Sequence, residues 1–286
     1  MPPPSLAVDS AARDFDPLSA LNHISNEADW IGIRFASETH HHRSARNGHL
    51  ESNQVIQTRG AMIEALMGGQ IAYAATSDLS PHGLRKAARL ASEMARATAP
   101  LRRADLSTAQ RPASVARHKG PSEIRLHQTR LSDFTGQLIK ATERLKVSDA
   151  IVTAVAEATL VESVTHYVTS NGTDLRQEHL LTYQNFGAIA AEGGETQQRS
   201  LNGPTARCLQ SGLESFYWDE LLDECERTGQ EALALLKAEN CPDEALDLIL
   251  SPDQMLLQIH ESIGHPLELD RILGDERNYA GWSFVK

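Results

Sequence analysis

The chain has few cysteines, few aromatic residues and no long apolar run. Its three cysteines, Cys208, Cys225 and Cys241, lie far apart, and none forms a C-x-x-C pair. This excludes a disulfide framework and a zinc ribbon, and it favours reduced thiols in the cytoplasm. No apolar run approaches the roughly eighteen residues of a membrane span, and the N-terminus lacks the basic start and apolar core of a secretory signal. We therefore expect a cytoplasmic protein without a membrane partner.

The charge balance is acidic. The formal net charge is −11, with 38 acidic and 27 basic residues. A general nucleic-acid binder needs a basic face, so no nucleic-acid partner is expected. The 286 residues, of which 41% are hydrophobic, are enough for two modest domains or one large one.

In the first third of the chain apolar and polar residues alternate, as is typical of β-strands. Residues 29–76 include "WIGIRFAS", an Asn47-Gly48 pair typical of a tight hairpin, and two apolar runs around Gly68-Gly69. The next segment, "DLSPHGLRKAARLASEMARAT", predicts a helix with Ser80 as its N-cap and a proline at its first position.

The middle of the chain repeats this organisation after a break. Residues 99–122 have no period and several breakers, which indicates a linker. A helix is expected over about 126–145, and then an antiparallel meander with turns at Asn171-Gly172 and Gly193-Gly194. Another helix follows in "DELLDECERTGQEALALLKAE", where Cys225 is expected to be a core residue.

These patterns predict an α+β fold in which antiparallel meander sheets pack against helices, in an N-terminal and a central α+β region. A histidine tract, His40, His41 and His42, lies inside the first strand-turn pattern. Neighbouring strand residues point to opposite faces and would not converge on one ion, so we interpret the tract as a polar loop.

The stretch "QIHESIGHPLELDRILG" carries the residues most suited to metal chemistry. It follows a short strand predicted over Leu246–Leu250 and a capping signal, with Ser251 as the cap, Pro252 at the first helical position and Gln254 three residues after the cap. His260 and His265 are therefore expected on a capped helix that leaves a strand.

The two histidines are five positions apart, which a regular α-helix does not align. At about 100° per residue the pair would diverge by about 140°. Gly264 and Pro266 flank the second histidine. One solution ends the helix at Gly264 and lets His265 turn back, because proline disfavours helical angles at the residue before it. The other is a single π-type turn, whose i→i+5 geometry realigns the pair.

In either geometry His260 and His265 could each give a ring nitrogen to a zinc ion, and Glu261 could act as general base. Catalytic zinc sites usually have three protein ligands, so a third ligand must come from elsewhere. Glu268 and Arg271, with Asp270 between them, could orient the ligands or could form an ordinary salt-bridged turn.

The longer stretch "LDLILSPDQMLLQIHESIGHPLELDRILGDERNYAGWSF" closely resembles the TldD/PmbA metallopeptidase signature, H-E-x-x-x-H-P-L-E-x-D-R. The resemblance implies that His260 and His265 are metal ligands and that Glu261 is the catalytic base. Because the motif is intact, the chain is similar to the TldD-like branch. The implied protein is cytoplasmic, depends on Zn²⁺ or another divalent ion, and cleaves short or unfolded peptides. It forms a homodimer, or a heterodimer with a PmbA-like subunit.

The resemblance also implies a domain plan. A disordered tail is expected over 1–20, a TldD-like N-terminal domain over 21–98, a linker over 99–122 and a central domain over 123–240. Residues 241–286 would begin a β-rich metallopeptidase domain that supplies a cysteine as third metal ligand. None of the three cysteines of this chain occupies that position, so we expect a truncated product whose motif helix exposes an apolar face.

Two functions remain open at this point. The first is a zinc-dependent peptidase that acts through metal-activated water. The second is a catalytically incomplete remnant that serves only as a dimerisation or peptide-binding module.

Overall fold

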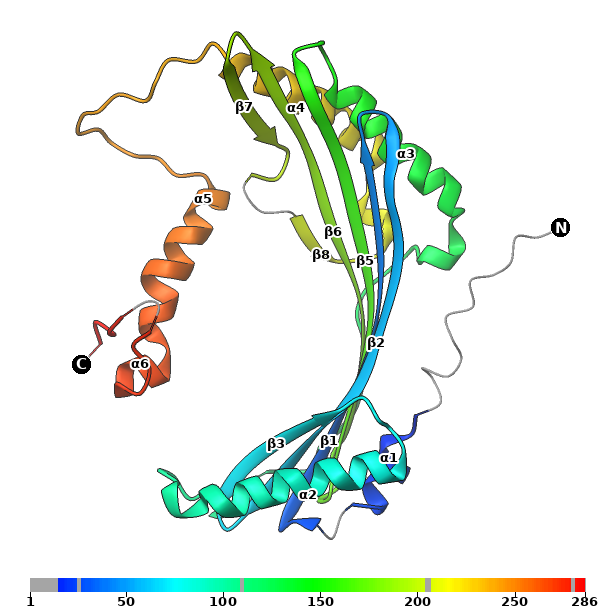
Figure 1. The fold of residues 1–286 in the computed structure, drawn as a ribbon, viewed down its shortest axis with the longest axis vertical. Coiled ribbons are helices and arrows are strands. Elements are labelled where there is room, and N and C mark those ends of the chain that lie inside the picture. Colours follow the sequence, from blue (N-terminus) through cyan, green and yellow to red (C-terminus); the bar gives the residue numbers. More distant parts are fainter. Residues whose placement is uncertain (1–14, 25–26, 109–110, 204–206, 279–280, 286) are drawn as a thin grey trace, which may run out of the picture.

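The computed structural model describes residues 15–24, 27–108, 111–203, 207–278 and 281–285. These residues form one eight-stranded sheet in the order β3-β2-β1-β5-β6-β4, and β7 and β8 also pair with β6. The strands are β1 (Trp30–Arg46), β2 (His49–Met67), β3 (Gln70–Thr76), β4 (Val115–Lys119), β5 (Ile151–Thr169), β6 (Asp174–Glu192), β7 (Glu195–Ser200) and β8 (Arg207–Gln210). The longer helices are α2 (Pro81–Thr98), α3 (Leu131–Leu145) and α4 (Trp218–Leu235). The predicted α+β class is confirmed (Figure 1).

The predicted turns lie where the sequence placed them. Asn47 and Gly48 both have positive φ, 49° and 83°, as a two-residue hairpin turn requires. Gly193 and Gly194 do the same between β6 and β7, with φ of 59° and 90°. At the start of α2, the Ser80 hydroxyl accepts a hydrogen bond from the Gly83 N–H at 3.2 Å, which confirms the predicted cap.

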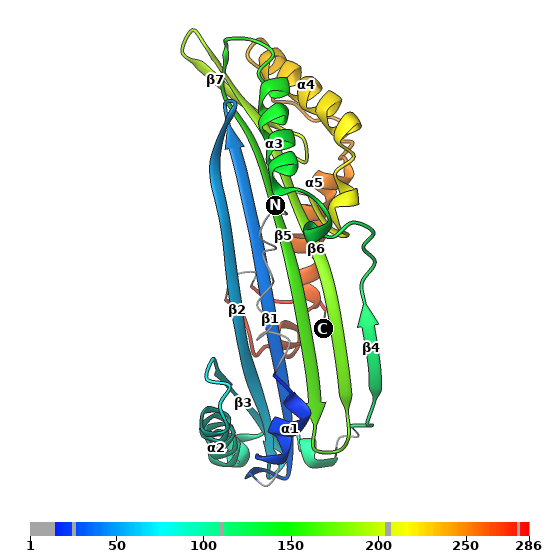
Figure 2. The same cartoon turned by 90° about the vertical axis from the view of Figure 1, so that its right-hand side faces the viewer.

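Two hydrophobic cores lie on the same face of this sheet. At one end α2 packs on β2 and β3, and α1 packs on β1 and β5, in a core that includes Ile33 of β1 and Val168 of β5. At the other end α3 and α4 pack over Ala45 of β1 and Ala156 of β5. Ile33 and Ala45 are an even number of positions apart on one strand, so both point to the same face. Figure 2 shows α2 and α3 at opposite ends of the long strands.

The pairing of β1 with β5 joins the two regions that the sequence separates. It runs from Gly32↔Thr169 to Arg46↔Val155. The N-terminal and central regions therefore share one continuous sheet, and the boundary proposed between them remains a prediction. Within the expected linker or crossing segment over 99–122, β4 forms a strand that the sequence did not indicate and pairs in parallel with the start of β6.

The histidine tract is a strand and not a loop. His40, His41 and His42 lie in the middle of β1 and are paired on both sides, with β2 and β5. His42 contacts the Thr159 hydroxyl at 3.0 Å. His41 points to the other face, where it is buried, and burial lowers its pKa. The ladder on both sides outweighs the polarity of the side chains, which is why the loop interpretation failed.

Two other expectations change at the ends of the chain. Residues 1–14 of the expected tail lie outside the described residues, but α1 (Pro17–Asn22) begins within it, with the Asp16 carboxylate accepting the Leu18 N–H at 3.0 Å. The predicted strand at Leu246–Leu250 does not form. Its residues have no ladder partner in the described chain, and Ile249 is 96% exposed. No described helix is long and apolar enough to span a membrane.

Candidate metal centre

The motif lies on a composite helix that changes its hydrogen-bond period along its length. It begins as α5 (Pro252–Leu257), continues as the π-helix η7 (Gln258–Gly264) and the 3₁₀ turn η8 (His265–Leu267), and is followed by α6 (Leu269–Leu273). Ser251 has the extended backbone of an N-cap, but its side chain makes no capping bond. The predicted capping box is therefore absent, and the Ser251 carbonyl accepts the N–H groups of Gln254 and Met255.

The π-helix resolves the two geometries that the sequence left open. The N–H of His265 donates to the carbonyl of His260, an i→i+5 bond that brings the two histidines to the same side. Their ring centroids are 4.6 Å apart, with an interplanar angle of 84°. The alternative in which the helix ends at Gly264 is wrong, because His265 keeps helical angles, φ −59° and ψ −45°, although Pro266 follows it.

Glu261 lies beside both imidazoles. Its carboxylate oxygens are 3.9 Å from His260 Nε2 and 3.7 Å from His265 Nε2. In the described part of the chain these three residues are the group with metal-ligand spacing, and their donor atoms lie within 4.8 Å of one another. The side chains of His260, Glu261 and His265 are 61%, 45% and 18% exposed. The structure thus brings together the three side chains that the motif singled out.

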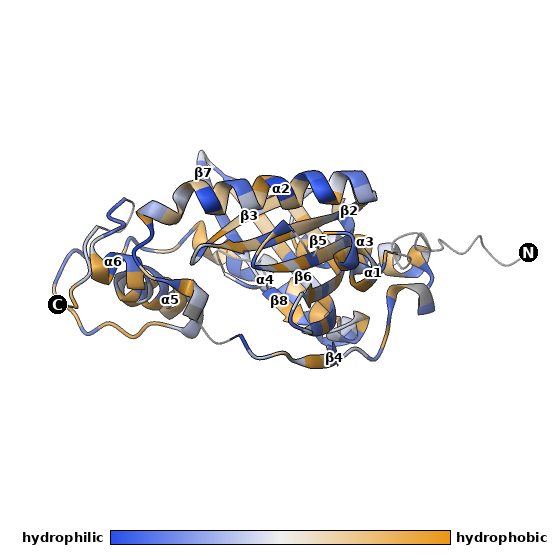
Figure 3. Cartoon of the chain, turned by 90° about the horizontal axis from the view of Figure 1, so that it is seen from below, coloured by the Kyte–Doolittle hydropathy of each residue, from blue (hydrophilic) through white to orange (hydrophobic). Residues whose placement is uncertain are grey.

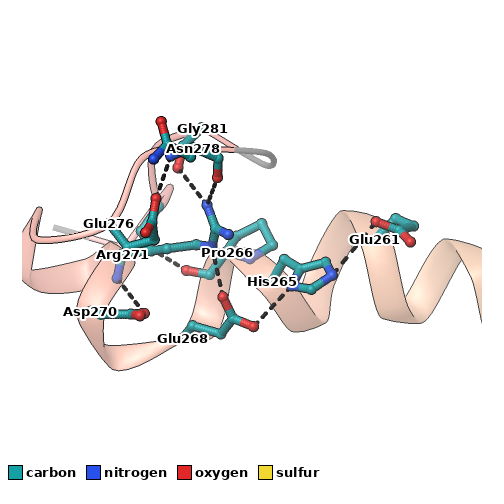
Figure 4. A network of polar contacts seen from close by, with 10 residues as sticks. Glu261, His265, Pro266, Glu268, Asp270, Arg271, Glu276, Asn278 and Gly281 are labelled. Carbon is teal, nitrogen blue, oxygen red and sulfur yellow. Dashed lines mark hydrogen bonds and ion pairs between the residues drawn. The ribbon is translucent and has the colours of Figure 1, made fainter.

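A chain of polar contacts runs from His265 into the turn that follows (Figure 4). His265 Nδ1 is 2.9 Å from Glu268 Oε1, and Arg271 Nε donates to Glu268 Oε2 at 2.7 Å. Arg271 is 6% exposed, and its Nη1 donates to the carbonyls of Asn278 and Gly281. The hydrogen bond from Arg271, and then that with His265, lowers the pKa of Glu268.

This chain of contacts bears on how the second histidine could act. His265 Nδ1 lies within hydrogen-bond distance of Glu268, so Nε2 is the ring nitrogen that could bind a metal. The donor set, two imidazoles and a carboxylate, therefore fits a divalent ion such as zinc. Asp270 Oδ1 accepts the backbone N–H of Arg271 at 2.8 Å. The sequence left Glu268 and Arg271 undecided between orienting ligands and bracing a turn. The contacts brace the turn, and the orienting role stays a prediction.

The three cysteines lie apart from this group. Cys225 is buried in α4, and burial raises the pKa of its thiol to about 12. Cys208, on β8, and Cys241 are exposed. Cys225 as a core residue is confirmed.

The composite helix also exposes an apolar face, as expected. Leu256, Ile259 and Ile263 are each about half exposed, and hydrophobic residues recur along α5 and α6 in Figure 3. Figure 1 shows this segment standing away from the sheet, on the side opposite α3. An ion pair between Arg103 and Asp275 connects it to the segment after α2.

Taken together, fold and site define an α+β protein with a candidate divalent-metal site on a π-helix. Residues 32–95 match the family model of the PmbA/TldA metallopeptidase domain 1. Over 262 residues the chain is 23% identical to a protein named "Metalloprotease" from Methanothermobacter thermautotrophicus, covering 89% of this chain and 54% of that protein. The family model and this relative both support a TldD/PmbA-family protein.

Solved structures show the same fold. TldE from Thermococcus kodakarensis matches with a TM-score of 0.54 and 13% identity, over 76% of this chain and 47% of that one. A putative modulator of DNA gyrase from Bacteroides thetaiotaomicron matches with a TM-score of 0.57 and 12% identity, over 77% and 48%. A putative modulator of a DNA gyrase from Thermotoga maritima matches with a TM-score of 0.55 and 14% identity, over 79% of this chain and 50% of that one. The chain spans about half the length of these relatives.

Proposed function

We propose that this chain carries the metal-binding helix of a TldD-like peptidase that hydrolyses short or unfolded peptides. The observation that carries the proposal is the π-helical bond between His265 and His260, which gathers both imidazoles and Glu261 within 4.8 Å. The family match, to a metallopeptidase domain, supports the reaction class.

Each residue of the group has a separate task in this proposal. His260 and His265 would hold the metal, for which we propose zinc, and Glu268 would keep His265 in the tautomer that can bind it. When bound, the ion supplies Lewis acidity that polarises a peptide carbonyl and lowers the pKa of a water molecule. Glu261 would accept a proton from that water and return it to the leaving amine. The exposure of His260 and Glu261 leaves room for a substrate to approach.

With Glu261 as the base, the group offers two metal ligands where catalytic sites usually have three. We therefore propose that the third ligand lies outside the group of His260, Glu261 and His265. A homodimer, or a heterodimer with a PmbA-like subunit, and a cytoplasmic location remain part of the proposal.

A second candidate is a binding module without catalysis. The observation in its favour is the exposed apolar face of Leu256, Ile259 and Ile263, which a partner or an apolar peptide could cover. In that case the helix would bind a partner through this face, and the loss of Glu261 would change nothing measurable.

Metal content and peptide cleavage separate the two candidates. The purified chain is stripped with a chelator, reloaded with zinc and assayed on a quenched fluorescent unfolded peptide. His260→Ala should lose the zinc, and Glu261→Gln should keep it but lose cleavage. His82→Ala, at an exposed position of α2, is the matched control. Zinc binding that survives His260→Ala would contradict the site, and cleavage that survives Glu261→Gln would contradict the assignment of the base.

A further inference from the structure

A cavity of about 280 Å³ opens on the helix-bearing face of the sheet, between the two hydrophobic cores. Ser37 and Thr39 of β1 line it, and on that strand they lie between Ile33 of one core and Ala45 of the other. The register Thr39↔Glu162↔Leu180 carries its floor across β5 and β6. The cavity belongs to neither core and lies outside the histidine site.

Four charged side chains line this cavity: Arg125, Glu162, Arg176 and Glu178. Arg176 and Glu178 neutralise each other, because Arg176 Nη2 and Nε lie 3.0 and 3.1 Å from Glu178 Oε1. Within the described residues, Glu162 and Arg125 take part in no ion pair. Among the described residues, the wall therefore offers one carboxylate, Glu162, and one guanidinium, Arg125, outside any ion pair, with His41 within range of the Glu162 charge.

The neighbouring strand residue extends this polar region. His41 follows Thr39 on the same face of β1 and is buried, and neither of its ring nitrogens has a hydrogen-bond partner in the described chain. Buried polar groups are normally hydrogen-bonded. A strip of Thr39, His41 and Glu162 between two apolar cores is costly unless something polar occupies the space beside it.

The charges select the kind of ligand. An anion would be attracted by Arg125 but repelled by Glu162. A cation would be attracted by Glu162 but repelled by Arg125. A molecule that carries both charges satisfies both groups. The volume lies at the low end of ligand pockets, which excludes a long peptide and suits a ligand of one or two residues.

We propose that this cavity binds a small zwitterion, a free amino acid or a dipeptide, with the ammonium group on Glu162 and the carboxylate on Arg125. Ser37 and Thr39 supply hydroxyl groups for the polar atoms between the two charges. This site is independent of the proposed peptidase, and it stands or falls without any metal.

The test compares ligands on the unchanged, metal-free chain by thermal unfolding at constant ionic strength. L-Alanine and alanyl-alanine are the probes, and the larger of their two Tm shifts shows which ligand length is preferred. N-acetylalanine, which lacks the ammonium group, and alaninamide, which lacks the carboxylate, are the analogues. We expect at least one probe to raise Tm and both analogues to fail. No shift with either probe, or an equal shift with either analogue, overturns the proposal.

Variants then place the ligand. Glu162→Gln and Arg125→Gln should each weaken binding of the preferred probe about ten-fold or more, because each removes a charged hydrogen-bond partner. Glu157→Gln, on the same strand but the opposite face, and Arg130→Gln, at an exposed position, are the matched controls. Unchanged affinity in either test variant overturns the proposal. If a variant does not fold, the analogue comparison on the unchanged chain decides alone.

Discussion

The sheet and the composite helix hold their important side chains in opposite ways. In the core between the sheet and its helices, residues such as Leu138 of α3 and Phe186 of β6 are fully buried, and packing fixes them. On the helix, His260 and Glu261 are exposed, and a backbone bond and a short chain of hydrogen bonds position them. The difference shows that packing provides the stability of this chain, whereas a local change of helical period provides its candidate chemistry.

Shortening one side chain in each region should therefore change the free energy of unfolding by very different amounts. Phe186→Ala, in the core under α3 and α4, should lower the free energy of unfolding by about 3–5 kcal/mol, because it leaves a cavity. Ile263 is 46% exposed, so Ile263→Ala should change the free energy of unfolding by less than about 0.5 kcal/mol. Urea unfolding followed by circular dichroism measures both. Similar losses in the two variants would mean that the helix is part of a packed core.

The hydrogen-bond support of His265 can be removed without touching a ligand. Glu268→Gln should weaken zinc affinity by about ten- to a hundred-fold, the usual effect of losing a carboxylate that holds a metal-binding histidine. Competition with a chromogenic chelator measures the affinity, and Asp270→Asn, which changes a residue that contacts only backbone here, is the control. Equal affinities in both variants would show that Glu268 only braces the turn.

Glu214 makes the stability of the sheet region depend on pH. Burial would raise the pKa of this carboxyl, but hydrogen bonds from the N–H groups of Ile124 and Gly212 and from Ser211 lower it to about 2. A depressed pKa stabilises the folded state above the unfolded value near 4.3, and this stability is lost as the pH falls from there towards 2.

Glu214→Gln should therefore cost about 1–2 kcal/mol at pH 7 and clearly less at pH 2.5, where most but not all of the linked stability is already lost. Urea unfolding at the two pH values tests this, with Glu220→Gln on α4 as the control. A loss of the same size at both pH values would show that the charge of Glu214 does not matter.

The smallest expected changes in stability concern two glycines of the sheet region. Gly48 has a φ of 83° in the β1–β2 turn, so Gly48→Ala should destabilise by about 1 kcal/mol. Gly136 lies inside α3 with open space around it, so Gly136→Ala should stabilise by about 0.5–1 kcal/mol. Thermal unfolding should move Tm in opposite directions, and a shift in the same direction would contradict the assignment of one of the two conformations.

Local signals were predictable from the sequence wherever a single residue type determines the conformation. Asn47-Gly48 set a turn and Ser80 a helix cap, and the spacing of His260 and His265 limited the motif to two geometries, of which one forms. What the sequence could not give depends on distant partners. The His40–His42 tract becomes a strand only because β2 and β5 flank it, and Leu246–Leu250 fails to become one because no ladder partner reaches it.

The candidate site was also predictable only in part. His260, Glu261 and His265 follow from the motif and are brought together, while their roles stay predictions. The link from His265 through Glu268 to Arg271 depends on how the turn after the helix closes, with Gly274 in the left-handed conformation at φ 77°. Hydropathy and spacing carry no information on that closure.

The pairing of β1 with β5 has a mechanical consequence. These strands have 17 and 19 residues, so each is roughly 60 Å long, and each contributes side chains to both cores. Unfolding of one core therefore disturbs strands that also form the other core. We expect calorimetry to show the two cores unfolding together, as a single cooperative unit.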